Sequence, residues 1–338
     1  MAFFMVKQRR RSVRPLYCTG MRIHIFTALA LTSALLAQDP ATIKVDVDVV
    51  SILASVRDKK GALIPSLQKE DFTVLEDGKP QTIKYFTKET DLPLTIGLLV
   101  DVSGSQRNLI DIERNAATQF FREVLRKKDL AFLISFGEET ELLQDYTSSG
   151  KLLSEGLGEL RPSSGVSGIH PGPVPTAGGP RGTVLYDAIY LAANEKLKGE
   201  VGRKVIVVIT DGVDMGSRMS RNQAIEAAQK SDAVIYSINY SDSSAYGPFG
   251  MGGGGGEGEL RKMSEETGGR VYKVDRRHTL DQVFKELQDE MRSQYSIAYT
   301  PTNDLGDGGY RHLEIKLANK DMKAQARKGY YAIKPGTK

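Results

Sequence analysis

Hydrophobic and polar residues follow two different patterns along the chain. Residues 43–89 alternate apolar and polar positions, include many β-branched residues and contain an Asp-Gly turn, which is typical of β-strands. The same alternation returns near the end of the chain, in residues 294–301, 310–319 and 323–333. Neither group has enough strands to be stable alone. We therefore expect residues 38–90 and 294–338 to form one small β-sandwich, rather than two separate appendages with exposed edges.

The middle of the chain, residues 91–293, alternates continuous apolar runs with segments of helical period. Strands that are apolar at every position are buried on both faces, as in a parallel sheet covered by helices. We therefore predict an α/β fold with a doubly wound, mostly parallel sheet, inserted in the sandwich. The expected strands are 94–100, 130–136, 204–210, 233–239 and 270–274, and the expected helices are 109–124, 184–196, 221–230, 259–267 and 280–292.

Two segments break this alternation. Residues 161–182 are rich in Pro, Gly and Ser, and residues 241–258 contain five consecutive glycines. Such compositions disfavour a fixed backbone, so we expect long flexible loops at both places.

The N-terminus predicts export. Residues 1–37 hold six basic side chains, no acidic one and a short apolar run followed by small residues, which is the pattern of a signal peptide. Met21 is an alternative start, and a short membrane anchor is an alternative interpretation, although the run is shorter than the roughly 20 residues of a membrane span. After cleavage we expect a protein without a stable membrane span in the periplasm, at the cell surface or secreted. Cys18, the single cysteine, would be lost with the signal.

Charge and motifs exclude several functions. The formal charge of +4 comes from the N-terminus, since the rest of the chain holds 40 basic against 42 acidic residues. This balance disfavours nucleic-acid binding. No G-x-G-x-x-G follows the first expected strand of the sheet, and the chain has no P-loop or G-x-S-x-G motif. The histidines after the signal, His170, His278 and His312, fall in polar segments, so a serine triad is not indicated. We expect no enzymatic activity.

Oxygen-bearing side chains follow two of the expected strands. Asp101, Ser103 and Ser105 come at alternate positions after the first strand, and Asp211 follows the strand 204–210. The carboxyl ends of parallel strands meet at one edge of a sheet, where ligands collect. A set of carboxylates and hydroxyls suits Mg²⁺, Mn²⁺ or Ca²⁺ rather than zinc. The sequence therefore predicts a metal site at this edge.

Thr183 is a further candidate, because it stands where the loop 161–182 meets the next helix. Taken singly, each of these residues has a simpler interpretation: Thr183 could be a helix N-cap, and Asp101 and the two serines could cap the helix that begins near Arg107. The conjunction of the segments, in this order and at these strand ends, favours the metal site.

The segments "DVSGS", "GTVLYDAI" and "VIVVITDG" together resemble the metal-ion-dependent adhesion site of von Willebrand factor A domains. The resemblance covers about residues 91–293. The flanking segments "KEDFTVLEDGKPQTIKYF", "YSIAYTP" and "ARKGYYAI" are similar to bacterial secreted proteins called VWFA-related domain proteins, which extends the resemblance over most of residues 43–333. Gln106 replaces the methionine often found after the second serine.

The resemblance implies a Rossmann-like fold and five metal-site residues, Asp101, Ser103, Ser105, Thr183 and Asp211. It also implies a function: a divalent cation, Mg²⁺ first, with Mn²⁺ or Ca²⁺ as alternatives, binds an Asp or Glu of a partner protein. The sequence thus predicts an exported, metal-dependent protein-binding module of unknown oligomeric state. Two alternatives stay open. One is a metal-dependent hydrolase, for which Glu138, Asp187 and Asp214 are the candidate bases, and the other is a structural envelope-assembly protein.

Overall fold

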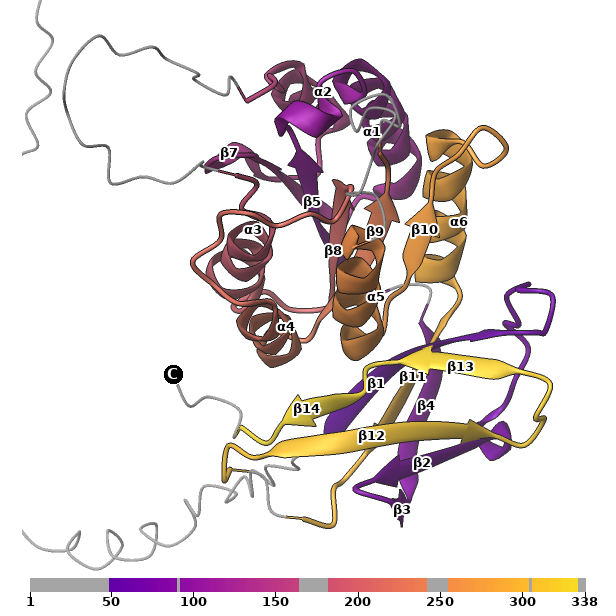
Figure 1. Ribbon diagram of the computed structural model, residues 1–338. Coiled ribbons are helices and arrows are strands. Elements are labelled where there is room, and N and C mark those ends of the chain that lie inside the picture. Colours follow the sequence, from indigo (N-terminus) through magenta and orange to yellow (C-terminus); the bar gives the residue numbers. More distant parts are fainter. Residues whose placement is uncertain (1–48, 90–91, 164–181, 242–254, 304–305, 334–338) are drawn as a thin grey trace, which may run out of the picture. The chain divides into compact units, whose positions relative to one another are not determined.

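The computed structural model describes residues 49–89, 92–163, 182–241, 255–303 and 306–333. This part of the chain contains a six-stranded, mostly parallel sheet flanked by helices and two four-stranded antiparallel sheets (Figure 1). The mixed α/β fold expected from the sequence is confirmed. The expected signal peptide and most of the two expected loops lie outside the described residues.

The order of strands in the central sheet places a topological switch at β5. The order is β10-β9-β8-β5-β6-β7, with every pair parallel except β6 and the edge strand β7. The chain runs from β5 to β6 on one side and later returns to β8 on the other side of β5. The strands are β5 (Leu94–Asp101), β6 (Leu130–Phe136), β7 (Thr140–Thr147), β8 (Arg203–Thr210), β9 (Ala233–Asn239) and β10 (Val271–Lys273).

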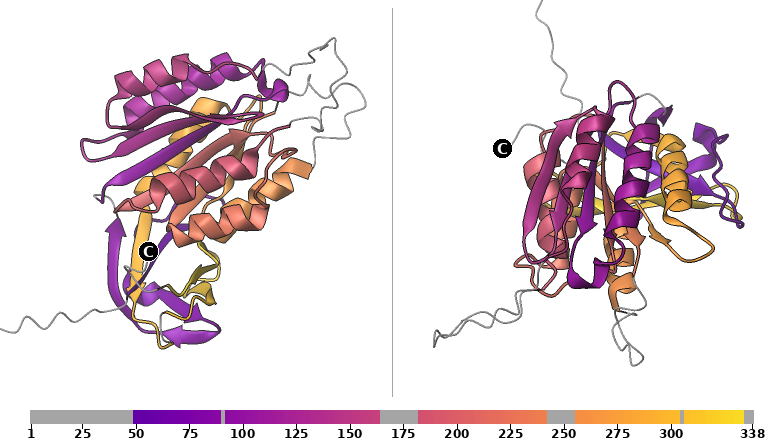
Figure 2. Two further views of the ribbon diagram at one scale, coloured as in Figure 1. Left: turned by 90° about the vertical axis from the view of Figure 1, so that its left-hand side faces the viewer. Right: turned by 90° about the horizontal axis from the view of Figure 1, so that it is seen from above.

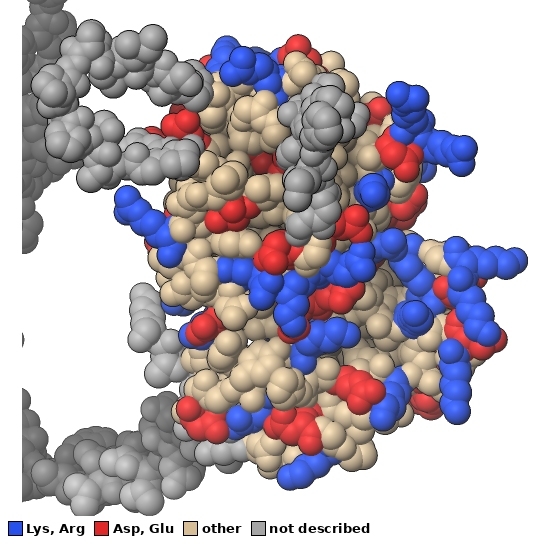
Figure 3. All heavy atoms as spheres, in the orientation of Figure 1, with Lys and Arg blue, Asp and Glu red and all other residues tan. Residues whose placement is uncertain are grey.

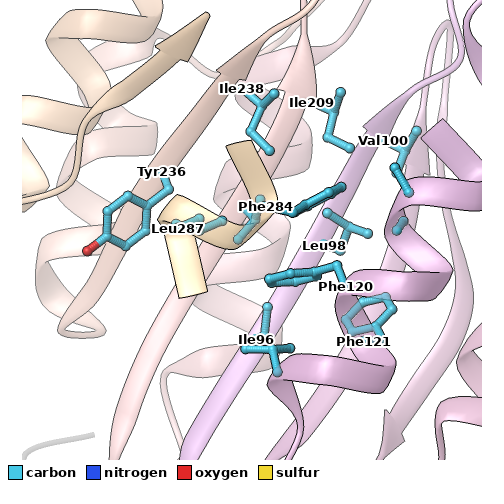
Figure 4. Close-up of a cluster of buried hydrophobic side chains, with 14 of the residues drawn as sticks. Ile96, Leu98, Val100, Phe120, Phe121, Ile209, Tyr236, Ile238, Phe284 and Leu287 are labelled. Carbon is cyan, nitrogen blue, oxygen red and sulfur yellow. The ribbon is translucent and has the colours of Figure 1, made fainter. Parts of the chain in front are cut away.

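Helices cover both faces of this sheet (Figure 2). Alternate residues of β5 enter two cores: Leu98 packs among α1, α2 and α6, whereas Leu99 packs among α3, α4 and α5. In the first core, the rings of Phe120 and Phe284 stack with centroids 4.5 Å apart (Figure 4). Burial on both faces explains the continuous apolar runs. The helices are α1 (Ile110–Val124), α2 (Gly150–Gly158), α3 (Leu185–Leu191) with a π-helical extension (Ala192–Leu197), α4 (Arg221–Lys230), α5 (Gly255–Thr267) and α6 (Leu280–Arg292).

Both antiparallel sheets combine strands that precede β5 with strands that follow α6. Their orders are β13-β1-β11-β4 and β14-β12-β2-β3, and residues of both sheets share one hydrophobic core. The two ends of the chain therefore pair with each other, as the alternation suggested, whereas the domain bounds given above stay a prediction. The strands are β1 (Val50–Arg57), β2 (Phe72–Glu76), β3 (Lys79–Gln81), β4 (Ile83–Glu89), β11 (Gln294–Tyr299), β12 (Tyr310–Leu317), β13 (Lys323–Ala326) and β14 (Gly329–Tyr331).

Three elements differ from the sequence-based expectation. β7 and α2 were not expected, and residues 323–333 form two strands in different sheets instead of one strand. The chain crosses between these sheets at Arg327 and Lys328, where the Lys328 amide bonds the carbonyl of Glu266. Within the part of the chain that the structure describes, no helix has the length and apolarity needed to cross a membrane.

A buried acid joins β1 to the central domain. The Glu290 side chain on α6 is fully buried, forms an ion pair of 2.6 Å with Arg57, and accepts hydrogen bonds from Ser55 (2.9 Å) and Tyr272 (2.7 Å). A buried carboxylate is tolerated only when it is paired and hydrogen-bonded, and these contacts supply both kinds of partner to Glu290.

Candidate metal centre

The candidate metal residues lie at the carboxyl ends of two neighbouring strands. β5 and β8 are parallel and paired up to Val100 and Ile209, so Asp101 at the end of β5 lies beside the segment that leads to Asp211. This edge is the switch point of the sheet, where the loops after β5 and β8 diverge and leave room for a ligand. The structure thus brings together the two strand ends that the sequence singled out.

Four of the five candidate residues form one chain of contacts. The Ser105 hydroxyl donates to Oδ2 of Asp211 (2.8 Å), and the hydroxyl oxygens of Ser103 and Ser105 are 3.1 Å apart. The Ser103 amide donates to Oδ1 of Asp101 (2.9 Å). Alternate positions after β5 therefore converge, as the extended spacing predicted.

Asp101 lies beneath the serines and is fully buried. Its Oδ2 accepts a 2.6 Å hydrogen bond from the hydroxyl of Thr210. Burial raises the pKa of Asp101 to about 6, against the opposing effect of hydrogen bonds from Ser103 and Thr210. Asp101 is therefore a carboxylate that exchanges its proton near neutral pH, and a nearby cation would favour its ionised form.

Two further polar side chains, those of Glu113 and Gln106, are buried close to this site. Glu113 on α1 is fully buried, and neither carboxyl oxygen has a hydrogen-bond partner among the described residues. Burial raises the pKa of Glu113 well above its usual range, and the charge of Asp101 raises it further. The Gln106 side chain is also fully buried, with both polar atoms unpartnered in the described part of the chain.

Thr183 is not the N-cap of the following helix. The N-cap of α3 is Val184, and the amide of Tyr186 in the first turn bonds the Ser217 hydroxyl (3.0 Å) and Asp214 (3.3 Å) from another loop. The Thr183 carbonyl accepts from the amide of Met215 (3.0 Å), which fixes the backbone at this point. The capping interpretation is therefore wrong for Thr183. Ser103 makes no side-chain cap either.

A hollow of about 380 Å³ opens above these residues. Ser103, Ser105, Thr183 and Asp211 all line it, so the fifth candidate faces the same space as three of the others. Asp101 is not among the lining residues and lies behind the serines. Arg107, Glu138 and Met215 form other parts of the wall.

The donor set fits a hard divalent cation. Among the described residues, no group of three or more His, Cys, Asp or Glu side chains is placed to hold a metal ion. Hydroxyls therefore have to supply part of any coordination here, and Ser103, Ser105 and Thr183 are in position to do so. Hydroxyl and carboxylate oxygens are ligands for Mg²⁺, Mn²⁺ or Ca²⁺.

Two of the three candidate catalytic bases accept hydrogen bonds from neighbouring loop residues. Asp187 accepts from the amides of Arg218 (3.1 Å) and Met219 (2.7 Å), and Asp214 accepts from Ser217. Of the three candidate bases, Glu138 alone lines the hollow. His170 lies outside the described residues.

The von Willebrand factor type A domain family model matches residues 177–286. This segment of the chain is similar to von Willebrand factor type A domains. The match includes Thr183 and Asp211, whereas Asp101 and the two serines precede it. The location of the matched segment agrees with the central domain of the fold, since it runs from the start of α3 to α6.

Solved structures are similar to part of the chain. BatB from Bacteroides thetaiotaomicron is 18% identical, with 59% of this chain and 97% of that chain covered and a TM-score of 0.44. An aerotolerance-related membrane protein from Bacteroides fragilis is 17% identical, with 59% and 98% covered and a TM-score of 0.43. Proximal thread matrix protein 1 from the mussel byssus, with a zinc-occupied MIDAS motif, is 14% identical, with 64% and 50% covered and a TM-score of 0.44.

Sequence reasoning missed two residues that shape the candidate metal site. Thr210 orients Asp101, and Gly212 adopts a left-handed φ of +84° immediately after Asp211. A Cβ at Gly212 would lie 2.5 Å from the carbonyl oxygen of Gly256, so glycine is required by both conformation and space. Thr210 and Gly212 could have been found in the sequence from their position on either side of Asp211 in "TDG".

Proposed function

We propose that this protein is an exported, non-catalytic module that binds a partner protein through a divalent metal ion. The convergence of Asp101, Ser103, Ser105 and Asp211 at the switch point of the sheet carries the proposal, and Thr183 lines the same hollow. The family match over residues 177–286 supports it, because such domains are generally interaction modules.

Each residue has a distinct role in this proposal. Ser103, Ser105 and Thr183 line the hollow, and their hydroxyls would hold the cation, with Mg²⁺ as the first choice and Mn²⁺ or Ca²⁺ as alternatives. The bound ion would supply an electron-poor centre that accepts a carboxylate oxygen from an Asp or Glu of the partner. Asp101 would balance the positive charge from beneath, where Thr210 and the Ser103 amide hold its orientation.

Calorimetric titration of the full chain with Mg²⁺ and Mn²⁺ tests the metal claim. We expect one saturable site that Asp101→Ala removes. Asp289→Ala, which removes an exposed carboxylate of α6, is the matched control and should bind as the native chain does. Equal binding by both variants, or no binding by the native chain, would contradict the proposal. Circular dichroism of the two variants checks that each remains folded.

The partner claim needs a separate experiment. A pull-down from the native cell envelope, run with Mg²⁺ and with EDTA, should capture a protein only when the metal is present. Ser105→Ala should reduce this capture, because Ser105 contacts both Ser103 and Asp211. Capture that survives EDTA would indicate the alternative of a structural assembly protein. A melting temperature that is the same in EDTA and in Mg²⁺ would further argue against a metal-stabilised fold.

Glu138 provides the test of the hydrolase alternative, because it is the candidate base that lines the hollow. If the bound ion activated water, Glu138→Gln should abolish turnover of generic phosphate or ester substrates in Mg²⁺. We expect no turnover in the native chain. Measurable turnover that depends on both Glu138 and Asp211 would overturn the non-catalytic part of the proposal.

A further inference from the structure

A second hollow, of about 370 Å³, lies away from the candidate metal centre. Its wall is formed by the turn after β1, by Arg270 just before β10, by Glu290 on α6, and by β13 with the turn that precedes it. Arg270 stands at the amino end of a parallel strand, whereas the metal candidates stand at carboxyl ends. The two sites therefore lie at opposite ends of the parallel strands.

Every acidic side chain in the wall of this hollow already has partners. Asp58 accepts from the backbone amides of Lys60 (2.8 Å) and Ala62 (2.9 Å). Glu290 is paired with Arg57 (2.6 Å), and Asp321 is paired with Lys59 (2.7 Å). The wall therefore holds five basic side chains against three acidic ones, and two of the three acids are already in ion pairs.

Three cations of the same wall have no such partner. Among the described residues, no acidic side chain lies within 4.0 Å of the charged nitrogens of Arg270, Lys320 or Lys323. The Arg270 guanidinium stacks over the ring of Tyr272, 4.8 Å from its centroid, which limits its motion. Figure 3 shows Lys and Arg side chains gathered on this side, over the region where β10 and β13 lie in Figure 1.

Hydrogen bonds hold the elements of this wall together. The Gln325 amide on β13 donates to the carbonyl of Gly269, immediately before Arg270 (2.8 Å). β1 and β13 pair with Arg57 opposite Lys323, and Arg57 in turn bonds Glu290 on α6. The cations are therefore presented on strands and turns that are bonded to one another, so a ligand has to order the lysine side chains but not the backbone that carries them.

We propose that this hollow binds a phosphate group. Three cations from two segments of the chain match in number the three terminal oxygens of a phosphomonoester, which carries about −1.5 to −2 charges at pH 7. A single carboxylate would neutralise one of them and leave the others unpaired. Arg270 supplies the planar fork that suits phosphate, and Lys320 and Lys323 supply point charges in the same wall.

Titration of the full chain with inorganic phosphate, in EDTA and at constant ionic strength, tests this site without any contribution from a bound metal. We expect saturable binding that weakens by about tenfold or more in the double variant Arg270→Gln/Lys323→Gln, since two charge-assisted hydrogen-bond donors are lost. Lys84→Gln/Lys316→Gln removes two exposed cations outside the hollow and should bind phosphate as the native chain does. If Arg270→Gln impairs folding, Lys320→Gln/Lys323→Gln replaces it.

Sedimentation with vesicles distinguishes the source of the phosphate. Binding to phosphatidic acid vesicles that the Arg270→Gln/Lys323→Gln chain lacks would identify a lipid headgroup, whereas binding of inorganic phosphate alone would identify a soluble phosphomonoester. Unsaturable binding, or an equal loss in the Lys84→Gln/Lys316→Gln chain, would overturn the proposal. So would acetate displacing phosphate at equal concentration.

Discussion

Replacing Glu113 with Gln should stabilise the protein at neutral pH. Glu113 is fully buried on α1, both of its carboxyl oxygens lack partners in the described part of the chain, and the charge of Asp101 acts on it. Burial raises its pKa in the folded state well above the ordinary value of 4.5. Gln has nearly the same shape as Glu and cannot ionise. The substitution therefore removes the titration of this side chain and changes its packing little.

The sign and size of the effect follow from proton linkage. Above pH 4.5 the unfolded chain releases the Glu113 proton while the folded chain keeps it, so the stability of the native protein falls as pH rises until the folded pKa is reached. The loss is about 1.4 kcal/mol for each pH unit in that window. The Gln variant has no such loss of stability, because its side chain does not ionise. At pH 7 we expect it to be more stable than the native chain by at least about 1.4 kcal/mol.

Urea unfolding at pH 4.5, 6 and 7, in EDTA, measures this difference. The two proteins should have nearly equal midpoints at pH 4.5 and should diverge as pH rises. Glu123→Gln, on the exposed side of the same helix, is the matched control and should follow the native curve. If the Glu113→Gln and native curves stay parallel from pH 4.5 to 7, the raised pKa of Glu113 is refuted.

Three further substitutions or conditions have defined outcomes. Glu290→Ala removes a fully buried carboxylate, leaves the partly buried Arg57 without its partner, and should cost about 3–5 kcal/mol in thermal unfolding; a loss below 1 kcal/mol would contradict the role of this pair. Gly97→Ala places a Cβ 2.3 Å from the ring of Phe132 and should cost about 1–3 kcal/mol in urea unfolding. An unchanged midpoint would show that the ring moves aside freely. Because the pKa of Asp101 is about 6, protons compete with the metal below that pH. Mg²⁺ affinity, measured by calorimetry, should fall about tenfold per pH unit there, and a flat profile would contradict this.

The central strands could be predicted because both of their faces are buried. β6 and β9 coincide residue for residue with the apolar runs that predicted them. β7 was missed because it is an antiparallel edge strand whose sequence, TELLQDYT, is half exposed and has no apolar face. α2 was missed because it is short and has glycines at both ends, and tertiary packing of Leu153 and Leu157 overrides its weak propensity.

The candidate site also has some residues that the local sequence predicts and others that only the structure reveals. Asp101, Ser103 and Ser105 could be recognised because their alternate spacing is local, and Asp211 because it also ends a strand. The hydrogen bond from Thr210 to Asp101 and the buried position of Glu113 depend on how β8 and α1 lie against β5, which no local pattern encodes. The N-terminal contacts of α3 come from Ser217, about thirty positions along the chain, so only the structure could separate Thr183 from a capping role.

Arg203 explains how the antiparallel sheets can be built from both ends of the chain. It begins β8, is almost fully buried, and donates to the carbonyls of Leu92, just before β5, and Met291, near the end of α6. These are the two points at which the chain passes between the central sheet and the antiparallel sheets. A guanidinium can satisfy both carbonyls because its donors are spread over a rigid plane, whereas an ammonium on a flexible stem would bond them in less defined positions. The strands that carry Asp101 and Asp211 at their carboxyl ends are thus held at their amino ends by one side chain, which gives the candidate metal centre a rigid base.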